Sequence, residues 1–322
     1  MNFKPILLVA GEPNSIFLEI FFKIDKIKKI KSPLILIGSN KVLNLQMKKF
    51  NFNKKIRLID PRIIDTYKLN NKTINIIDVK YNTKKTFEKI TVKSRSYIDN
   101  CFQVAMNIIN TGFTKKLING PVSKKNFLGK KYPGVTEYLA SKYNKKKFAM
   151  LIYNKNLSVC PITTHLPLKN VAKKIKKKTI IEKVLLINDF FKTHFKIKPR
   201  IAITGLNPHC ENFTDTNEDN EILKPTVNYL YKSGLKVFGP FPADTIFTKN
   251  NRKKYDVIVG MYHDQVLTPM KTLYEYDAIN ITLGLPFLRI SPDHGPNVSM
   301  LGKNLSNPLS LIKAINFLDK IK

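Results

Sequence analysis

Short apolar runs rich in β-branched residues alternate along this chain with longer amphipathic segments, and this alternation limits the fold more than any other feature. Short runs of this kind indicate buried strands, whereas the longer segments have the spacing of amphipathic helices. Chains in which strands alternate with helices form α/β domains with a mostly parallel sheet. We therefore expect an α/β protein with a mostly parallel sheet.

The pattern places most of the expected elements. It predicts strands at 6–10, 34–38, 116–119, 200–205, 237–239 and 257–260, and a hairpin from 148–153 and 157–161. Helices are expected at 16–27, 96–110, 136–142, 169–193, 221–233 and 309–321. The stretch 54–92 is less regular, and we assign it to a peripheral lobe.

The chain length predicts two lobes. At 322 residues the chain has reached the size at which a single core begins to split. We expect residues 1–322 to form one enzyme unit of two interleaved α/β lobes with an active-site cleft, and the pattern leaves the lobe boundaries open. Ligands in such sheets bind outside the carboxyl ends of the strands.

The composition favours a cytoplasmic protein without a membrane span. No stretch approaches the apolar length of a spanning helix. The apolar run 6–10 is followed by a turn and no signal-cleavage site. Cys101, Cys160 and Cys210 are odd in number and widely spaced, which is typical of a reducing compartment without disulfides.

The net charge of +33 first suggests a nucleic-acid partner. However, the lysines are spread along the chain together with many Asn and Ile residues, as a genome of biased base composition would produce. No zinc-finger spacing or RNP-type aromatic motif is present. We therefore expect no nucleic-acid partner, although the charge would steer anionic small molecules towards the protein.

Three of the five histidines lie in short polar segments marked by Pro or Gly, namely 164–168, 205–209 and 262–265. Imidazole suits Zn, Co or Mn, and three histidines with open positions are typical of a catalytic metal site. The spacing between His165, His209 and His263 is too long for a local site, so the fold would have to assemble it. The alternative is that each is an ordinary loop or core histidine.

Further polar residues follow predicted strands or apolar runs. Asp264 places a carboxylate beside His263, where it could orient a different histidine or belong to a capped turn. Asp244 is either a helix cap or a cleft carboxylate. Lys271, Asn280 and Arg289 follow within one region, and Lys and Arg bind phosphate or carboxylate groups unless they form surface salt bridges. The glycine fingerprints of common nucleotide sites are absent.

Taken together, the motifs resemble those of the 4-hydroxythreonine-4-phosphate dehydrogenase family of vitamin B6 biosynthesis. The resemblance covers nearly the whole chain and rests on seven motifs: GLNPH, GPFPADTIF, YHDQ, NITLGLPFLR, SPDHG, PGVTE and THLPL. It implies the two-lobed fold of isocitrate and isopropylmalate dehydrogenases, and a homodimer with active sites at the interface. It also implies NAD or NADP as cofactor, with a divalent metal such as Zn, Mg, Co or Mn.

The resemblance also implies roles for particular residues. His165, His209 and His263 match the family's metal ligands, which come from both subunits of the dimer. A phosphorylated small molecule would contact four matching positions: Thr136, Lys271, Asn280 and Arg289. Asp244 and Asp264 match acidic residues near the metal, and the catalytic base is Asp244 or Lys271. The implied reaction oxidises and decarboxylates 4-phosphooxy-L-threonine.

The chain departs from the family pattern at three places. Val135 stands where the family has a substrate-contacting histidine before the threonine of PGHTE. The glycine-rich GDPAGIGPE pattern is replaced by GEPNSIFLE, which begins at Gly11, and GLNPHAGEGG is replaced by GLNPHCENF. Val135 permits the same chemistry on another phosphorylated hydroxy acid, such as a four-carbon sugar acid phosphate. A third alternative is a ligand-binding homologue without activity.

Overall fold

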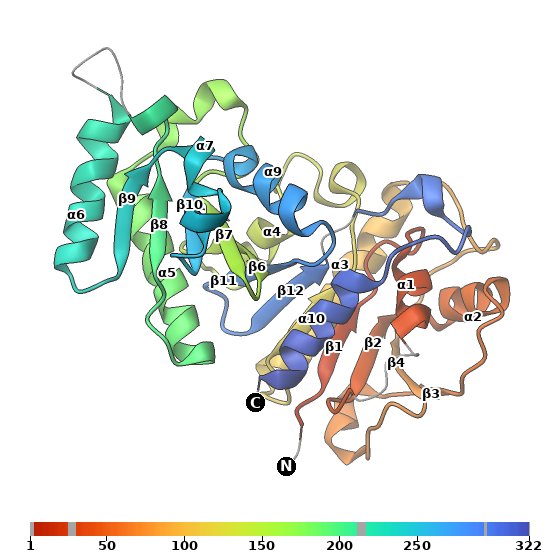
Figure 1. Ribbon diagram of the computed structural model, residues 1–322. Coiled ribbons are helices and arrows are strands. Elements are labelled where there is room, and N and C mark those ends of the chain that lie inside the picture. Colours follow the sequence, from red (N-terminus) through yellow and green to blue (C-terminus); the bar gives the residue numbers. More distant parts are fainter. Residues whose placement is uncertain (1–2, 25–29, 211–216, 293–294, 322) are drawn as a thin grey trace. The chain divides into compact units, whose positions relative to one another are not determined.

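The computed structural model describes residues 3–24, 30–210, 217–292 and 295–321 (Figure 1). The chain divides into two compact units. The first comprises Met1–Tyr138 and Pro286–Lys322, and the second comprises Leu139–Leu285. The second unit is therefore an insertion into the sequence of the first.

The first unit contains a parallel sheet with the strand order β3-β4-β2-β1-β5-β12, in which every neighbouring pair is parallel. Helix α3 packs against β1 and β2, and α10 packs against β12, β5 and β1. The strands are β1 (Ile6–Val9), β2 (Leu34–Gly38), β3 (Ile56–Leu58), β4 (Ile74–Asp78), β5 (Lys116–Asn119) and β12 (Leu288–Pro292). The helices are α1 (Phe17–Lys23), α2 (Asn40–Lys49), α3 (Arg95–Asn110) and α10 (Leu309–Lys320), and α4 (Val135–Lys142) spans the boundary between the units.

The second unit contains strands in the order β11-β6-β7-β10-β8-β9. Strand β6 is antiparallel to both neighbours, whereas β7, β10, β8 and β9 are parallel to one another. The strands are β6 (Ala149–Asn154), β7 (Leu157–Pro161), β8 (Ile201–Thr204), β9 (Val237–Phe241), β10 (Val257–Gly260) and β11 (Ile279–Leu283). The helices are α5 (Lys177–Phe195), α6 (Lys224–Lys232), α7 (Ala243–Ile246), α8 (Lys249–Arg252) and α9 (His263–Tyr274).

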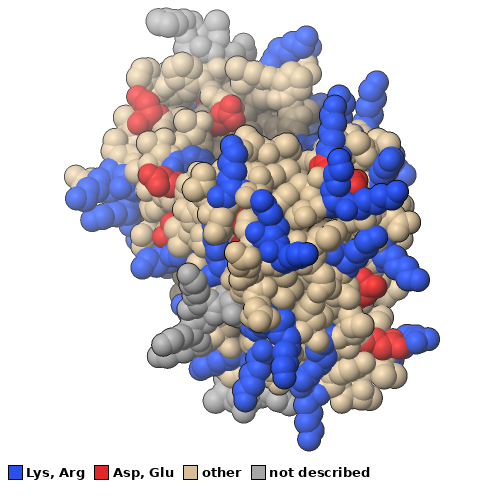
Figure 2. Space-filling model, turned by 90° about the vertical axis from the view of Figure 1, so that its right-hand side faces the viewer, with Lys and Arg blue, Asp and Glu red and all other residues tan. Residues whose placement is uncertain are grey.

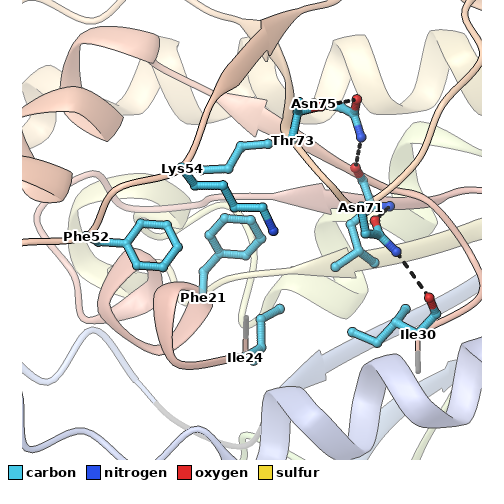
Figure 3. A pocket seen from close by; sticks show the side chains of 10 residues that line it. Phe21, Ile24, Ile30, Phe52, Lys54, Asn71, Thr73 and Asn75 are labelled. Atoms are coloured by element: carbon cyan, nitrogen blue, oxygen red, sulfur yellow. Dashed lines mark hydrogen bonds between the residues drawn. The ribbon is translucent and has the colours of Figure 1, made fainter. Parts of the chain in front are cut away.

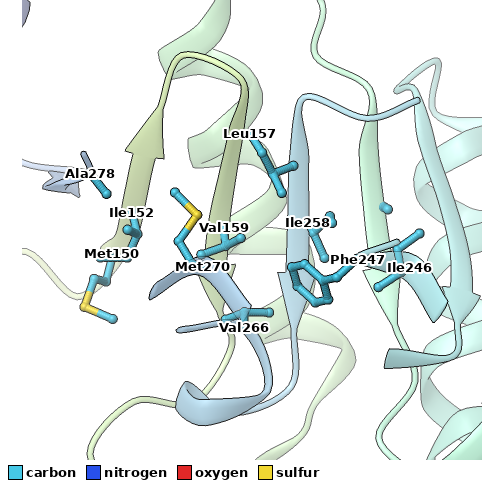
Figure 4. Packing of buried hydrophobic residues seen from close by; sticks show 11 residues of the cluster. Met150, Ile152, Leu157, Val159, Ile246, Phe247, Ile258, Val266, Met270 and Ala278 are labelled. Carbon is cyan, nitrogen blue, oxygen red and sulfur yellow. The ribbon is translucent and has the colours of Figure 1, made fainter. Parts of the chain in front are cut away.

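A hydrophobic cluster anchors α9 on the sheet of the second unit (Figure 4). Val266 and Met270 of this helix are buried in one cluster with Val159 of β7 and Ile258 of β10. Burial of each such side chain contributes roughly 1.5–3 kcal/mol. Helix α9 is thereby fixed on its buried face, and it begins at His263, one of the predicted metal ligands.

The expected α/β class with a mostly parallel sheet is confirmed, and β2, β5, β7 and β10 coincide with predicted strands. The stretch 54–92 differs from the expectation, because it holds β3 and β4. Strand β4 escaped the pattern because Asn75 interrupts its apolar run. That side chain is buried and donates to the carbonyl oxygens of Leu34 and Asn70.

Two further features have local causes. The segment 280–289, which is not among the predicted strands, lies in two strands, β11 and β12, because a bend at Gly284 separates them, and the φ of +90° at this residue favours glycine. The helix expected at 169–193 begins only at Lys177, since Lys176 is extended. A run of lysines disfavours helix through repulsion between neighbouring turns. Of the helix expected at 16–27, α1 covers Phe17–Lys23, and 25–29 lie outside the described residues.

Candidate active site

Four adjacent parallel strands of the second unit end at one edge of the sheet, and each is followed by a predicted site residue. His165 follows β7, His263 follows β10, His209 follows β8, and Asp244 follows β9. Because these strands are parallel neighbours, their carboxyl ends lie at the same edge, where open α/β sheets bind ligands. The fold thus gathers the three histidine segments that are far apart in the sequence.

Backbone pairing beyond the strand ends joins the segments of His165 and His263. The N–H of Ile162 donates to the carbonyl oxygen of Gly260 at 2.7 Å. The N–H and the hydroxyl of Thr163 both donate to the carbonyl oxygen of Met261, at 3.1 and 2.8 Å. The ring centroids of His165 and His263 are consequently 6.1 Å apart.

Gln265 joins the segment of His263 to that of His209. Its Oε1 accepts from the Thr204 hydroxyl at 2.8 Å and from the Met261 N–H at 2.7 Å, and its Nε2 donates to the Gly205 carbonyl oxygen at 2.8 Å. One carboxamide therefore connects the ends of β8 and β10. Gln265 was not among the predicted site residues, although it belongs to the YHDQ motif.

The loop that carries His209 is organised by a buried carboxylate, Asp219. Its Oδ1 accepts from the N–H of Leu206 at 2.8 Å, and its Oδ2 accepts from the N–H and Nδ2 of Asn207 at 3.0 and 2.8 Å. His209 itself is exposed and has a φ of +56°, in the left-handed region. Asp219 was not among the predicted site residues, and its partners lie 12 and 13 residues earlier.

We predict that Asp219→Ala destabilises the second unit. The substitution leaves the N–H groups of Leu206 and Asn207 without their acceptor, and the expected loss in unfolding free energy is roughly 2–4 kcal/mol. Urea unfolding followed by circular dichroism measures it. Glu218→Ala is the matched control, because Glu218 is the neighbouring carboxylate and accepts a long bond, 3.3 Å, from Nδ2 of Asn207. Equal effects of the two substitutions would contradict the role of Asp219.

Asp264 pairs with its sequence neighbour, His263. Its Oδ1 lies 2.6 Å from Nδ1 of His263, so it can orient the ring of this histidine. With the proton on Nδ1, the ring donates to the carboxylate and presents Nε2 as a metal-binding atom. Helix α9 has no side-chain cap, so the capped-turn alternative does not hold.

The donor set at this edge suits a divalent metal ion, although no three ligands meet around one point among the residues that the structure describes. Within the described part of the chain, no group of three or more His, Cys, Asp or Glu side chains is close enough to hold a metal. His165 and His209 are exposed, and the side chain of His263 is 37% exposed. The metal assignment of these histidines therefore stays a prediction.

The remaining predicted residues of the second unit occupy different positions. Asp244 is exposed in the first turn of α7, whose N-cap is Pro242 without a side-chain bond, so Asp244 is not the cap. Lys271 is half-buried in the last turn of α9. Asn280 is the second residue of β11, and its buried Oδ1 has no hydrogen-bond partner among the described residues. An unpaired buried acceptor of this kind suits a donor group of a ligand.

The first unit contains a second group of predicted residues. Arg289 of β12 is 3% exposed, and its Nη1 donates to the hydroxyl of Thr136 at 3.3 Å. Its Nε donates to Oδ1 of Asn119 at 2.7 Å. Burial lowers the pKa of the Arg289 guanidinium to about 10, and the nearby Glu137 carboxylate acts in the opposite direction. Thr136 and Arg289 therefore form one buried, positively charged group.

The altered N-terminal motif is also buried. Phe17, the first residue of α1, is 1% exposed, and its ring lies 2.7 Å from the position that a Cβ at Gly120 would take. Glu12 is 1% exposed and accepts from the Ser94 hydroxyl at 2.7 Å and the Asn14 N–H at 3.3 Å. Burial raises the pKa of the Glu12 carboxyl, and these hydrogen bonds oppose the rise. Residues 293 and 294 of the SPDHG motif and residues 211–213 of the GLNPHCENF segment lie outside the described residues.

A cavity of about 180 Å³ in the first unit lies away from these groups (Figure 3). Its lining includes Leu34 and Ile74, the first residues of β2 and β4, so it lies at the amino ends of the strands. Its asparagines hold backbone groups: Asn71 accepts from the Leu34 N–H and donates to the carbonyl oxygens of Ile30 and Ser32. None of the predicted site residues lines this cavity.

Lysine and arginine side chains are scattered over the face shown in Figure 2, with acidic side chains among them. They form no single stripe on this face, in keeping with their spread along the sequence. The cysteines Cys101, Cys160 and Cys210 are free and buried. Among the described residues, no helix is long and apolar enough to cross a membrane.

Parallel sheets with polar groups at the carboxyl ends of adjacent strands place this chain among α/β proteins that bind a ligand at the strand ends. A comparison with known families is more specific. The family model of the pyridoxal phosphate biosynthetic protein PdxA matches residues 29–318, and the chain belongs to this family. The family resemblance seen in the motifs is thereby confirmed.

Individual relatives agree with this membership. The chain is 38% identical to a 4-hydroxythreonine-4-phosphate dehydrogenase of Sulfurihydrogenibium sp., over 96% of each chain. It is 31% identical to a D-threonate 4-phosphate dehydrogenase of Salmonella typhimurium, over 97% of each chain. A crystal structure of 4-hydroxythreonine-4-phosphate dehydrogenase from Klebsiella pneumoniae superposes with a TM-score of 0.84 and 28% identity, over 98% of each chain.

Proposed function

We propose that this protein is an NAD(P)- and divalent-metal-dependent 4-hydroxythreonine-4-phosphate dehydrogenase. It would oxidise 4-phosphooxy-L-threonine, with loss of CO2, to 3-amino-2-oxopropyl phosphate in pyridoxal phosphate biosynthesis. The observation that carries the proposal is the convergence of three histidine segments on adjacent strand ends, in a chain that belongs to the PdxA family.

Different residues of the chain would bind the substrate and the metal. Thr136 and Arg289, with Lys271 and Asn280, would bind the substrate, and the buried guanidinium suits its phosphate or carboxylate group. His165, His209 and His263 would hold the metal, with Asp264 fixing the ring of His263. A bound metal would supply polarisation of the substrate's alcohol and carbonyl oxygens, and a bound nicotinamide would supply the hydride acceptor.

The proton of the alcohol must pass to a base of the protein. Asp244 and Lys271 remain the two candidates, since both are exposed or half-buried in the second unit. We further propose that the protein is a cytoplasmic homodimer with active sites at the interface. The exposure of His165 and His209 in the single chain supports a site that a second subunit completes.

The test is formation of NADH or NADPH by the purified protein from 4-phosphooxy-L-threonine, with Zn, Co, Mg or Mn added in turn. We expect metal-dependent turnover that falls at least about 100-fold in His209→Ala, because a lost ligand removes the metal's polarisation of the alcohol. Sedimentation shows whether the variant keeps its oligomeric state. A folded, metal-loaded wild type without turnover would rule out the proposed reaction.

A second candidate substrate is a four-carbon sugar acid phosphate, for which the relative that acts on D-threonate 4-phosphate is a precedent. Val135 favours it, because this half-buried residue directly precedes Thr136 and offers no hydrogen bond. Comparison of kcat/KM for 4-phosphooxy-L-threonine and D-threonate 4-phosphate distinguishes the two. A higher value for D-threonate 4-phosphate would replace the first assignment.

A further inference from the structure

The side chain of Gln265 makes more contacts than a helix cap requires. Gln265 is the third residue of α9, where a glutamine commonly reaches back to a backbone N–H at the start of the helix. Its Oε1 does so, because it accepts from the N–H of Met261 at 2.7 Å. The same oxygen also accepts from the Thr204 hydroxyl, and Nε2 donates to the Gly205 carbonyl oxygen, both at 2.8 Å. A cap of α9 needs only the first contact, so the two contacts with the end of β8 call for another role.

The carboxamide of Gln265 is held in one orientation. Two donors meet at Oε1 and one acceptor meets Nε2, so a flipped amide would lose these bonds. Thr204 is 0% exposed. A Cβ at Gly260 would lie 3.0 Å from Oε1 of Gln265 and 2.3 Å from Cγ1 of Val266, so the first turn of α9 packs closely over the end of β10. Gln265 is therefore a rigid link between β8 and α9.

This link holds the point at which the segment of His209 begins. The carbonyl oxygen of Gly205 accepts from Gln265, and the N–H of Gly205 donates to the carbonyl oxygen of Phe241 at 2.9 Å. A Cβ at Gly205 would lie 2.6 Å from Sγ of Cys210, so the segment turns back onto its own first residue. His209 lies within this turn, and its direction depends on where the turn starts.

We propose that Gln265 is a positioning residue for the metal site, because it fixes the start of the His209 segment relative to α9. A histidine binds a metal tightly only when its surroundings hold the ring in place, and this holds also for a site that a second subunit completes. A carboxamide provides the link without adding charge beside the metal. The metal affinity then depends on a side chain that is not itself among the proposed ligands. This inference rests on the proposed function.

The test measures Co²⁺ binding and amide hydrogen exchange in the purified full chain. Gln265→Met removes the three hydrogen bonds and keeps a side chain of similar length without charge. We expect the Co²⁺ affinity, measured by equilibrium dialysis, to fall about tenfold. Exchange of the 205–210 amides in the metal-free protein should be about tenfold faster, because the turn has lost its anchor. Asn71→Leu is the matched control, since Asn71 is a carboxamide of the first unit that also makes three hydrogen bonds, and it should change neither quantity.

Thermal unfolding of the two variants separates this role from a merely structural one. Their unfolding temperatures should lie within a few degrees of each other, while only Gln265→Met loses Co²⁺ affinity. Equal losses of affinity in the two variants would refute the inference alone. So would wild-type affinity, or unchanged exchange of the 205–210 amides, in Gln265→Met. A wild type that binds no Co²⁺ would refute the proposed metal role of the histidines, and the inference with it.

Discussion

Replacement of Arg289 by leucine should reduce kcat/KM about 10³-fold, on the order of 4 kcal/mol. The guanidinium is buried and donates to the side chains of Asn119 and Thr136, which fix its orientation. Leucine removes both the charge and the paired donors that match a phosphate or carboxylate. Initial rates of NAD(P)H formation over a range of substrate concentrations measure the loss.

The same substitution should change the unfolding free energy by less than about 2 kcal/mol, because two effects offset each other. Removal of a buried charge favours the folded state, and the lowered pKa of Arg289 reflects this cost of burial. Against it, Oδ1 of Asn119 loses its donor. Arg200→Leu is the control, since it removes an exposed cation paired with Asp256. Equal losses of kcat/KM in Arg289→Leu and Arg200→Leu would show that Arg289 acts only through the overall positive charge of the protein.

Gly120→Ala should lower the unfolding free energy by about 3 kcal/mol. The added methyl group would lie 2.4 Å from the Ala10 carbonyl oxygen and 2.7 Å from the Phe17 ring. Neither neighbour can move freely, because one is backbone and the other is a buried side chain. Chemical denaturation gives the difference.

The matched control for this substitution is Gly295→Ala. A Cβ at Gly295 meets nothing within 4 Å. We expect the control to stay within about 0.5 kcal/mol of the wild type. A small effect at Gly120 would mean that β1 and β5 separate more easily than their packing indicates. Phe17→Leu should recover only part of the loss, since the contact with the Ala10 carbonyl remains.

The strands could be predicted because buried parallel strands are continuous apolar runs, and β2 and β10 have this form. The convergence of the histidine segments followed from the same logic, because residues after parallel strands meet at one edge. The proposed division of roles rested on the family resemblance and not on spacing.

The residues that hold the site in shape were not predictable. Asn119 and Arg289 are separated by 170 residues, and Thr204 and Gln265 by 61, and no local pattern reveals such pairs. Asp219 carries no sequence signal, because the sequence around a buried aspartate that accepts from loop N–H groups does not differ from that around an exposed aspartate. These contacts depend on tertiary packing, which a single sequence does not display.

Because the second unit is inserted into the first, the second unit is completed earlier than the first during synthesis. When the ribosome has released residues up to 285, every strand of the second unit is already present, while the first unit still lacks β12 and α10. The second unit can therefore fold on the growing chain, whereas the first must wait for its last segment to join β5. Since that segment carries Arg289, the proposed anion-binding group forms only after the whole second unit has been synthesised.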